Sequence, residues 1–167
     1  MRRWVVGLTL LGGVQVLLLG IWWEVERART PVDDGEAFAQ FEALARPAPE
    51  LRFSRWDGST GTISASRGPV VVHFWATWCP PCLDELPALL AWAERSGATV
   101  IAASVDTEWL RVERFLSGTV PAPVVLVDAE APRTWGAEAL PTTFLVREGR
   151  ITHMARGAVD WEVVELP

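Results

Sequence analysis

Residues 70–82 read VVVHFWATWCPPC, an apolar run that leads directly into two cysteines with two prolines between them. A short run of β-branched and aromatic residues is typical of a buried strand, which we predict over residues 69–75. A helical pattern follows from Leu83 to Ala93, so the cysteines lie where a strand ends and a helix begins. The helix dipole and free backbone N–H groups favour an anion at that place, which predicts a reactive Cys79 thiol.

The spacing of the two cysteines predicts a dithiol that exchanges disulfides. Cys82 follows Cys79 by one helical turn, so it is placed to attack a mixed disulfide that Cys79 has formed with a partner. Pro80 and Pro81 have no N–H and remove two donors that would stabilise the Cys79 thiolate. The loss of those donors predicts a reduction potential at the reducing end of the range known for dithiol–disulfide pairs.

Two interpretations without redox exchange remain open at this stage. The pair is half of a possible zinc site, for which His73 and His153 are the only histidines in the chain. It is also compatible with a structural staple, although so short a loop constrains the unfolded chain little.

The N-terminal segment is predicted to anchor the chain in a membrane. Residues 4–23 carry no charge and would rise roughly 30 Å as a helix, the thickness of a bilayer core. Arg2 and Arg3 favour a cytoplasmic N-terminus, which would place the remaining chain outside the cytoplasm. A cleaved signal peptide and a buried core helix are the alternatives. We assign residues 1–23 to one transmembrane helix, 24–49 to a juxtamembrane tether and 50–167 to the soluble domain.

Secondary structure in the rest of the chain alternates between strands and helices. Within the tether, Asp33 or Asp34 is placed to cap a short helix that carries Phe38, Phe41 and Leu44. In the soluble domain, the alternation of strands and helices predicts an α/β fold, with a mixed central sheet and helices on both faces. Its expected elements besides those above are a hairpin of 51–56 and 62–64, strands at 98–105 and 124–127, a helix around 109–116, and a hairpin of 142–147 and 150–155.

The residues around the cysteines, with two later segments, resemble the thioredoxin superfamily. The resemblance is strongest to its membrane-tethered periplasmic branch of TlpA-like, ResA-like and cytochrome-c-maturation proteins. It covers residues 49–162 and is carried by FWATWCPPC at 74–82, Glu85, Pro87, LPTTFL at 140–145, GRI at 149–151, Gly157 and Trp161. It implies a thioredoxin-like fold and thiol-disulfide oxidoreductase activity.

The resemblance also implies roles for individual residues. Pro141 would be a cis-proline facing the dithiol, and Trp78, Pro80, Leu140 and Thr142 would join it in contacting the substrate. Sequence alone favours a trans bond at any X-Pro position.

Two titratable residues are candidates for moving the protons of the dithiol. Glu85 aligns with an acid that lies close to the dithiol in ResA-like proteins and influences its protonation. His73 occupies the position at which thioredoxin carries a buried acid. A neutral imidazole there is a candidate acceptor for the Cys82 proton, and the alternative is a histidine satisfied within the core.

These observations favour a reductase that opens disulfides of extracytoplasmic proteins, with apocytochrome c and a membrane thiol donor implied by the resemblance. The expected location is the bacterial inner membrane, single-pass, with the soluble domain in the periplasm.

The alternative functions are a disulfide-forming or stress-related oxidoreductase and a copper-binding module using the cysteines with His153 or Met154. Ala76, three residues before Cys79, disfavours peroxidase chemistry. The net charge of −6 and scattered arginines argue against nucleic-acid binding, and we expect no cofactor and no bound metal.

Overall fold

The computed structural model describes residues 40–63 and 68–164. The chain divides into two units, residues 1–36 and 37–167, and all described residues belong to the second. The predicted transmembrane helix at 1–23 and the residues Asp33, Asp34 and Phe38 lie outside the described ranges. Within those ranges, no helix is long and apolar enough to cross a membrane.

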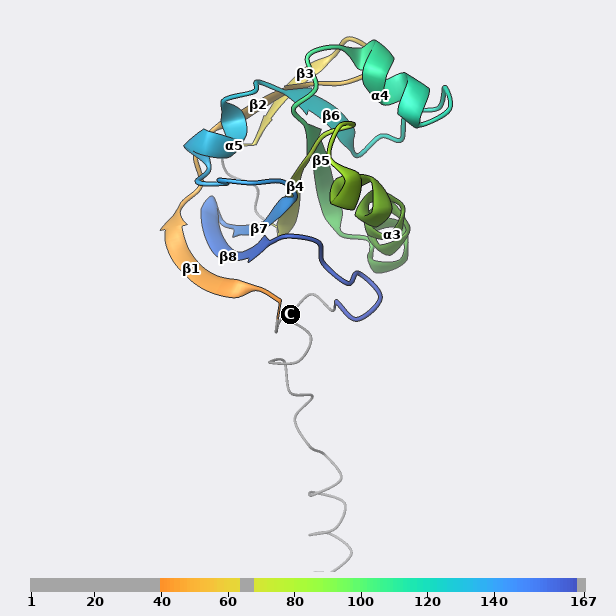
Figure 1. Cartoon of the computed structure of the whole chain (residues 1–167). Coiled ribbons are helices and arrows are strands. Elements are labelled where there is room, and N and C mark those ends of the chain that lie inside the picture. The colour runs from red at the N-terminus through yellow and green to blue at the C-terminus, as the bar shows by residue number, and fades with distance from the viewer. Residues whose placement is uncertain (1–39, 64–67, 165–167) are drawn as a thin grey trace, which may run out of the picture. The chain divides into compact units, whose positions relative to one another are not determined.

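An eight-stranded mixed sheet forms the centre of the domain (Figure 1). Its strands are β1 (Glu42–Pro47), β2 (Leu51–Ser54), β3 (Thr60–Ile63), β4 (Val70–Trp75), β5 (Thr99–Ser104), β6 (Val124–Val127), β7 (Thr142–Arg147) and β8 (Arg150–Arg156). They lie in the order β1-β8-β7-β4-β5-β6-β2-β3. β4 pairs in parallel with β5 and antiparallel with β7, so the strand that leads into the cysteines is fully enclosed.

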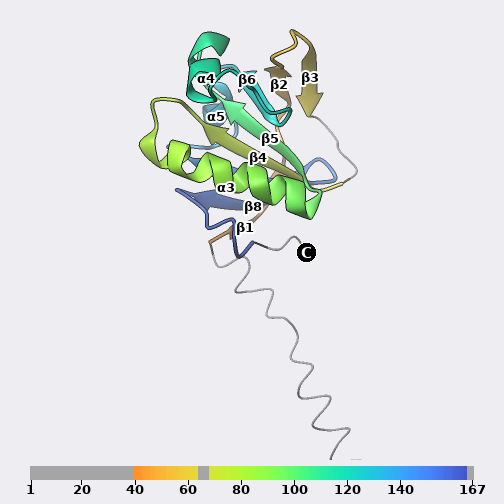
Figure 2. The ribbon, with the colours of Figure 1, turned by 90° about the vertical axis from the view of Figure 1, so that its right-hand side faces the viewer.

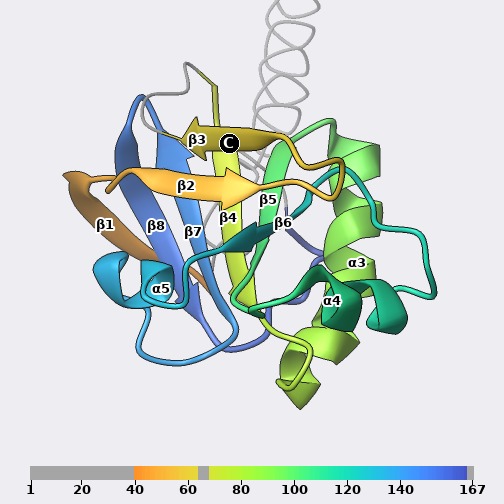
Figure 3. The same cartoon turned by 90° about the horizontal axis from the view of Figure 1, so that it is seen from above.

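Helices cover both faces of this sheet, as the sequence predicts. The helices α3 (Pro80–Ser96) and α4 (Trp109–Phe115) lie on one face, and α5 (Ala131–Thr134) lies on the other (Figure 3). Leu86 and Leu89 of α3 share a core with Val112 of α4. Figure 2 shows α3 running across the sheet beside β4 and β5.

The side chains of β4 alternate between two cores. Val71 and Trp75 belong to the core beneath α3, whereas Val72 and Phe74 belong to the core on the opposite face. Successive side chains of a strand point to opposite faces, so His73 faces α3 together with Val71 and Trp75. This alternation brings the histidine to the side of the sheet that carries the cysteines.

Strand β1 is the main departure from the predicted organisation. The composition of its residues predicts a tether that includes part of a short helix, but β1 pairs antiparallel with β8. Arg156 forms an ion pair with Glu42 at 2.6 Å, and Arg150 donates to the carbonyl of Ala45 at 2.9 Å. The predicted helix through Phe41 and Leu44 is therefore wrong, and the sheet begins before residue 50. Pairing with the free edge of β8 overrides the helical propensity of this segment.

The chain after β8 contains no helix within residues 157–164, which we call the C-terminal segment. It packs against α3 through Val159, Trp161 and Val164, all of which are buried in the core beneath that helix. The indole N–H of Trp92 in α3 donates to the carbonyl of Val164 at 2.8 Å. The C-terminal segment thereby covers the part of α3 that follows the cysteines.

Candidate active site

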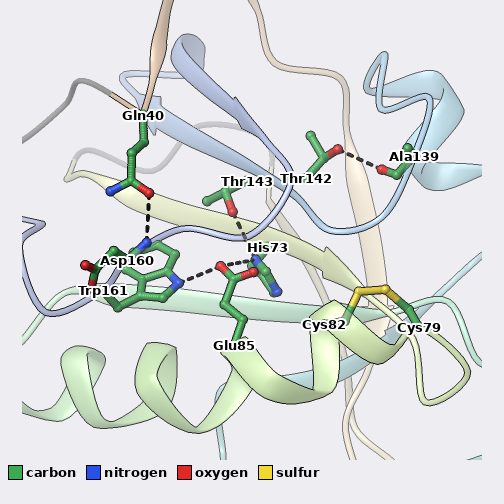
Figure 4. Close-up of polar contacts among 10 residues, drawn as sticks. All are labelled: Gln40, His73, Cys79, Cys82, Glu85, Ala139, Thr142, Thr143, Asp160 and Trp161. Atoms are coloured by element: carbon green, nitrogen blue, oxygen red, sulfur yellow. Dashed lines mark hydrogen bonds and ion pairs between the residues drawn. A yellow bond between two sulfur atoms is a disulfide. The ribbon is translucent and has the colours of Figure 1, made fainter.

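The two cysteines lie at the start of α3, where they form a disulfide with their Cα atoms 5.3 Å apart (Figure 4). Cys79 is the extended residue that precedes the helix, and the prolines occupy its first two positions. The amide of Cys82 donates to the carbonyl of Cys79 at 3.0 Å. Cys79 is 5% exposed and Cys82 is fully buried.

The residues expected to contact a substrate lie at the ends of two adjacent strands. Thr142 at the start of β7 is paired with Phe74 near the end of β4, so the loop before β7 borders the loop that carries the dithiol. The Leu140–Pro141 peptide bond is cis, as the resemblance implies. Trp78 is 64% exposed, which leaves its ring free for contact with another protein.

The loop before β7 is held by hydrogen bonds on both sides of Leu140. The hydroxyl of Thr142 donates to the carbonyl of Ala139 at 2.7 Å, and the carbonyl of Pro141 accepts from the amide of Gly157 at 2.9 Å. No hydrogen bond joins the backbone of Leu140 to another described residue. The arrangement leaves one residue of this loop available for backbone pairing.

Glu85 lies one turn after Cys82 on the buried side of α3 and is 5% exposed. Its Oε1 accepts a hydrogen bond of 2.6 Å from the indole N–H of Trp161 in the C-terminal segment. The same oxygen lies 3.8 Å from Nδ1 of His73, which is within hydrogen-bond distance, 3.0 Å, of the Thr143 hydroxyl. Residues from β4, β7, α3 and the C-terminal segment thus converge behind the dithiol (Figure 4).

Burial shifts the two titratable groups of this cluster in the directions that keep them neutral. It raises the pKa of Glu85 from 4.5 to about 7, against the hydrogen bond from Trp161 and the amide of Val159, which both lower it. Burial lowers the pKa of His73 from 6.5 to about 3. At pH 7, the 3.8 Å contact is therefore between a neutral imidazole and a carboxyl that is about half protonated. It is not a permanent ion pair. A carboxyl with a pKa near neutrality can both accept and return a proton.

Asp106 is a structural support of the site that the sequence analysis does not identify. It is 4% exposed, and its carboxylate accepts hydrogen bonds from the Thr77 amide at 2.9 Å, the Thr77 hydroxyl at 2.7 Å and the Ser104 hydroxyl at 2.7 Å. These contacts fasten the loop before Cys79 to the end of β5. The only signal in the sequence is the position of Asp106 just after a predicted parallel strand.

The described residues offer no cluster of three or more His, Cys, Asp and Glu side chains that could hold a metal ion. Among the described residues, the zinc interpretation therefore gains no such cluster around the two cysteines. Histidine 73 points to Glu85 and Thr143, and its other ring nitrogen has no hydrogen-bond partner among the described residues.

Fold and site together define an enzyme, a thiol-disulfide oxidoreductase with a thioredoxin-like fold. The chain belongs to the AhpC/TSA family, whose model matches residues 44–154. It is 30% identical over 136 residues to the thiol-disulfide oxidoreductase ResA of Bacillus subtilis strain 168, covering 76% of each chain. It is 26% identical over 176 residues to the thiol:disulfide interchange protein DsbE of Xylella fastidiosa, covering 98% of this chain and 85% of the relative.

The solved structures agree with this assignment. A putative thiol:disulfide interchange protein DsbE from Chlorobium tepidum is similar with a TM-score of 0.59 and 26% identity, covering 73% of this chain and 90% of that one. StoA from Bacillus subtilis is similar with a TM-score of 0.57 and 25% identity, covering 72% and 95%.

Proposed function

We propose that the protein is a reductase that opens disulfides in proteins outside the cytoplasm, with apocytochrome c as a candidate substrate. The observation that carries the direction is the pair of prolines at the first two positions of α3. They leave the Cys79 sulfur without two backbone donors that would stabilise a thiolate, and the nearby Glu85 carboxylate also disfavours one. A reduced form that is poorly stabilised gives up its electrons readily.

In the proposed reaction, the reduced protein transfers two electrons to its substrate. The Cys79 thiolate attacks one sulfur of the substrate disulfide, which breaks that bond, forms a mixed disulfide and releases the other substrate sulfur as a thiolate that takes up a proton. Cys82 then loses its proton and attacks the Cys79 sulfur. The protein disulfide forms, the mixed disulfide breaks, and the second substrate thiolate leaves and is protonated.

Glu85 is the proposed acceptor of the Cys82 proton. It follows Cys82 by one turn of the same helix, and its pKa of about 7 lets it take a proton from a thiol and return it to a leaving thiolate. His73 is the other candidate acceptor that the sequence offers. Full burial keeps its imidazole neutral with a pKa of about 3, which makes it a weak base and favours Glu85 for the role.

The substrate is proposed to bind across the dithiol and the loop before β7. The exposed Trp78 and Pro80 would contact its side chains, and the backbone of Leu140 would pair with its extended chain. Pro141 and Thr142 would hold that backbone in place through their contacts with Gly157 and Ala139.

The proposed setting is the outer face of a bacterial inner membrane. The uncharged run at 4–23 would form a single-pass anchor within residues 1–23, with 24–49 leading to a periplasmic domain at 50–167 whose sheet also takes in β1. A membrane protein with a reactive dithiol would return two electrons and two protons to the Cys79–Cys82 disulfide after each cycle. Hydroperoxide reduction is not expected, because Ala76 occupies the position three residues before Cys79.

The equilibrium reduction potential of the protein tests the direction of transfer. We would titrate it against dithiothreitol and glutathione and follow tryptophan fluorescence, since Trp75 and Trp78 lie close to the dithiol in sequence. We expect a value near that of thioredoxin, roughly −270 mV. A value near −120 mV would contradict the proposal and assign the protein to disulfide formation.

A further inference from the structure

We propose that Trp161 is a positioning residue for the dithiol chemistry: its indole N–H holds one oxygen of Glu85 and leaves the other oxygen to exchange the proton. This inference rests on the proposed role of Glu85 as the proton acceptor. It adds the C-terminal segment, which carries none of the reacting atoms, to the groups that control the proton.

The contact itself is short and enclosed. Nε1 of Trp161 lies 2.6 Å from Oε1 of Glu85, and both residues are at least 95% buried (Figure 4). A hydrogen bond donated to a carboxyl stabilises its ionised form more than its neutral form. The indole therefore lowers the pKa of a group that burial raises, which leaves it at about 7. Without the indole, Glu85 would hold its proton more tightly.

The C-terminal segment holds the indole in place from both sides. The amide of Asp160 donates to Oε1 of Gln40 at 2.8 Å, and the carbonyl of Val164 accepts from the indole of Trp92 at 2.8 Å. The ring of Trp161 packs on that of Trp92 with centroids 4.9 Å apart. The hydrogen bond to Glu85 thus comes from a donor whose position is fixed by other contacts.

The second oxygen of Glu85 is the one left for proton transfer. Oε2 has no hydrogen-bond partner among the described residues. Glu85 and Trp161 both line a groove of about 330 Å³ between α3 and the C-terminal segment. A buried polar atom beside a space of that size is a place that water can reach, so the carboxyl has a route to solvent.

The other groups that face Glu85 do not replace the indole. His73 of β4 is neutral, and Thr143 of β7 contacts that histidine. The titratable residues that line the groove are all acidic: Asp84 from α3, and Asp160 and Glu162 from the C-terminal segment. Carboxylate oxygens accept hydrogen bonds, so none of these side chains takes the place of the indole donor. The donors that lower the Glu85 pKa are the indole of Trp161 and, as a smaller contribution, the backbone amide of Val159, and both belong to the C-terminal segment.

The indole N–H resonances of the unmodified full-length protein provide the first test. We would follow them by ¹⁵N NMR between pH 5 and 9 in the oxidised form. The Trp161 resonance should titrate with a midpoint near the Glu85 pKa of about 7. The Trp92 resonance, whose acceptor is a carbonyl, should not follow that titration. A Trp161 resonance that does not change over this range would overturn the proposal, even if no variant can be purified.

Matched variants provide the second test. Trp161→Phe removes the donor and keeps an aromatic ring, and should move the midpoint of the pH–rate profile for disulfide reduction upward by about one pH unit. Trp135→Phe changes a fully buried indole in the core on the opposite face of the sheet and should leave the midpoint unchanged. An unshifted midpoint in Trp161→Phe, or equal shifts in both variants, would contradict the role of Trp161.

Glu85→Gln separates this inference from the function on which it rests. If Glu85→Gln keeps the full pH dependence of the unmodified protein, the proposed role of Glu85 fails. If Glu85→Gln abolishes that dependence but Trp161→Phe does not move it, the role of Glu85 stands and only the role of Trp161 fails. We expect Trp161→Phe to have no further effect on the pH profile when it is introduced into Glu85→Gln.

Discussion

The two faces of strand β4 bury different kinds of groups. On the face away from α3, Phe74 packs edge to face on Trp135 and Phe144, with ring centroids 5.8 and 5.9 Å apart. On the face toward α3, His73 lies next to the carboxyl of Glu85 within an otherwise apolar core. One face of β4 therefore packs against aromatic rings, whereas the other places a buried imidazole next to a carboxyl of α3. Substitutions on the two faces should accordingly change different measured quantities.

The largest effect on stability is expected from the packing face. Phe144→Ala removes a fully buried ring and should lower the free energy of unfolding by about 4 kcal/mol. Urea unfolding of the oxidised protein measures this loss, with the half-exposed Val163→Ala as a control that should change stability by less than about 0.5 kcal/mol. The reduction potential of Phe144→Ala should remain that of the unmodified protein. A large change in potential would show that the two faces are not separable.

The next largest effect on the free energy of unfolding is expected from Glu85. Its replacement should stabilise the protein at high pH, whereas Phe144→Ala destabilises it. The folded protein holds the Glu85 proton up to a pKa of about 7, whereas the unfolded chain releases it near 4.5. The stability that this difference provides is present below pH 4.5 and is lost as the pH rises to 7, by on the order of 3 kcal/mol. Glu85→Gln should therefore be more stable than the unmodified protein above pH 7, while its disulfide reductase activity falls.

Unfolding curves at pH 5 and pH 8 check this prediction. The gain from Glu85→Gln should be clear at pH 8 and should largely disappear at pH 5. An equal gain at both pH values would mean that the carboxyl is not the group that titrates.

His73 should have a smaller effect on the free energy of unfolding, and this effect should appear below pH 6.5. The unfolded chain binds a proton at the histidine below pH 6.5, whereas the folded protein resists it down to a pKa of about 3. This stabilisation is present above pH 6.5 and is lost as the pH falls, by about 2 kcal/mol at pH 5. His73→Gln should flatten this loss between pH 6.5 and 5. Thermal unfolding across that range measures it, and an unchanged slope would argue that His73 does not stay neutral in the folded protein.

The smallest effect on stability is expected at the surface. Trp78 is 64% exposed, so Trp78→Ala should change the free energy of unfolding by less than about 0.5 kcal/mol. Its proposed contact with the substrate predicts a several-fold loss of kcat/KM with a protein disulfide. The rate with a small disulfide such as oxidised glutathione should change much less. Equal losses with both substrates would place Trp78 in the chemistry and not in binding.

Much of the sheet could be predicted from the sequence because its signals are local. The apolar run of β4 and the helical period of α3 each lie within one short segment. Strand β1 could not be predicted, because it depends on pairing with β8 more than 100 residues later. The helix α5 has only four residues, which is too short for a periodic pattern.

The site likewise combines features that are local in sequence with contacts between residues far apart in the chain. The dithiol and the position of Glu85 after Cys82 follow from spacing within one helix. The contact between Trp161 and Glu85 joins residues 76 positions apart, and the support from Asp106 to Thr77 joins residues 29 apart. Contacts of this kind arise from the packing of the sheet and leave no periodic pattern in the sequence.

The roles assigned to the two sulfurs are tested most directly by trapping the mixed disulfide. Each cysteine would be replaced in turn by serine, and each variant would be mixed with a disulfide-containing protein and analysed on a non-reducing gel. Cys82→Ser should accumulate a mixed disulfide through Cys79, because the resolving thiol is absent. Cys79→Ser should accumulate little or none, because the remaining sulfur is fully buried. Trapping by Cys79→Ser at the same rate would contradict the assignment of Cys79 as the attacking sulfur.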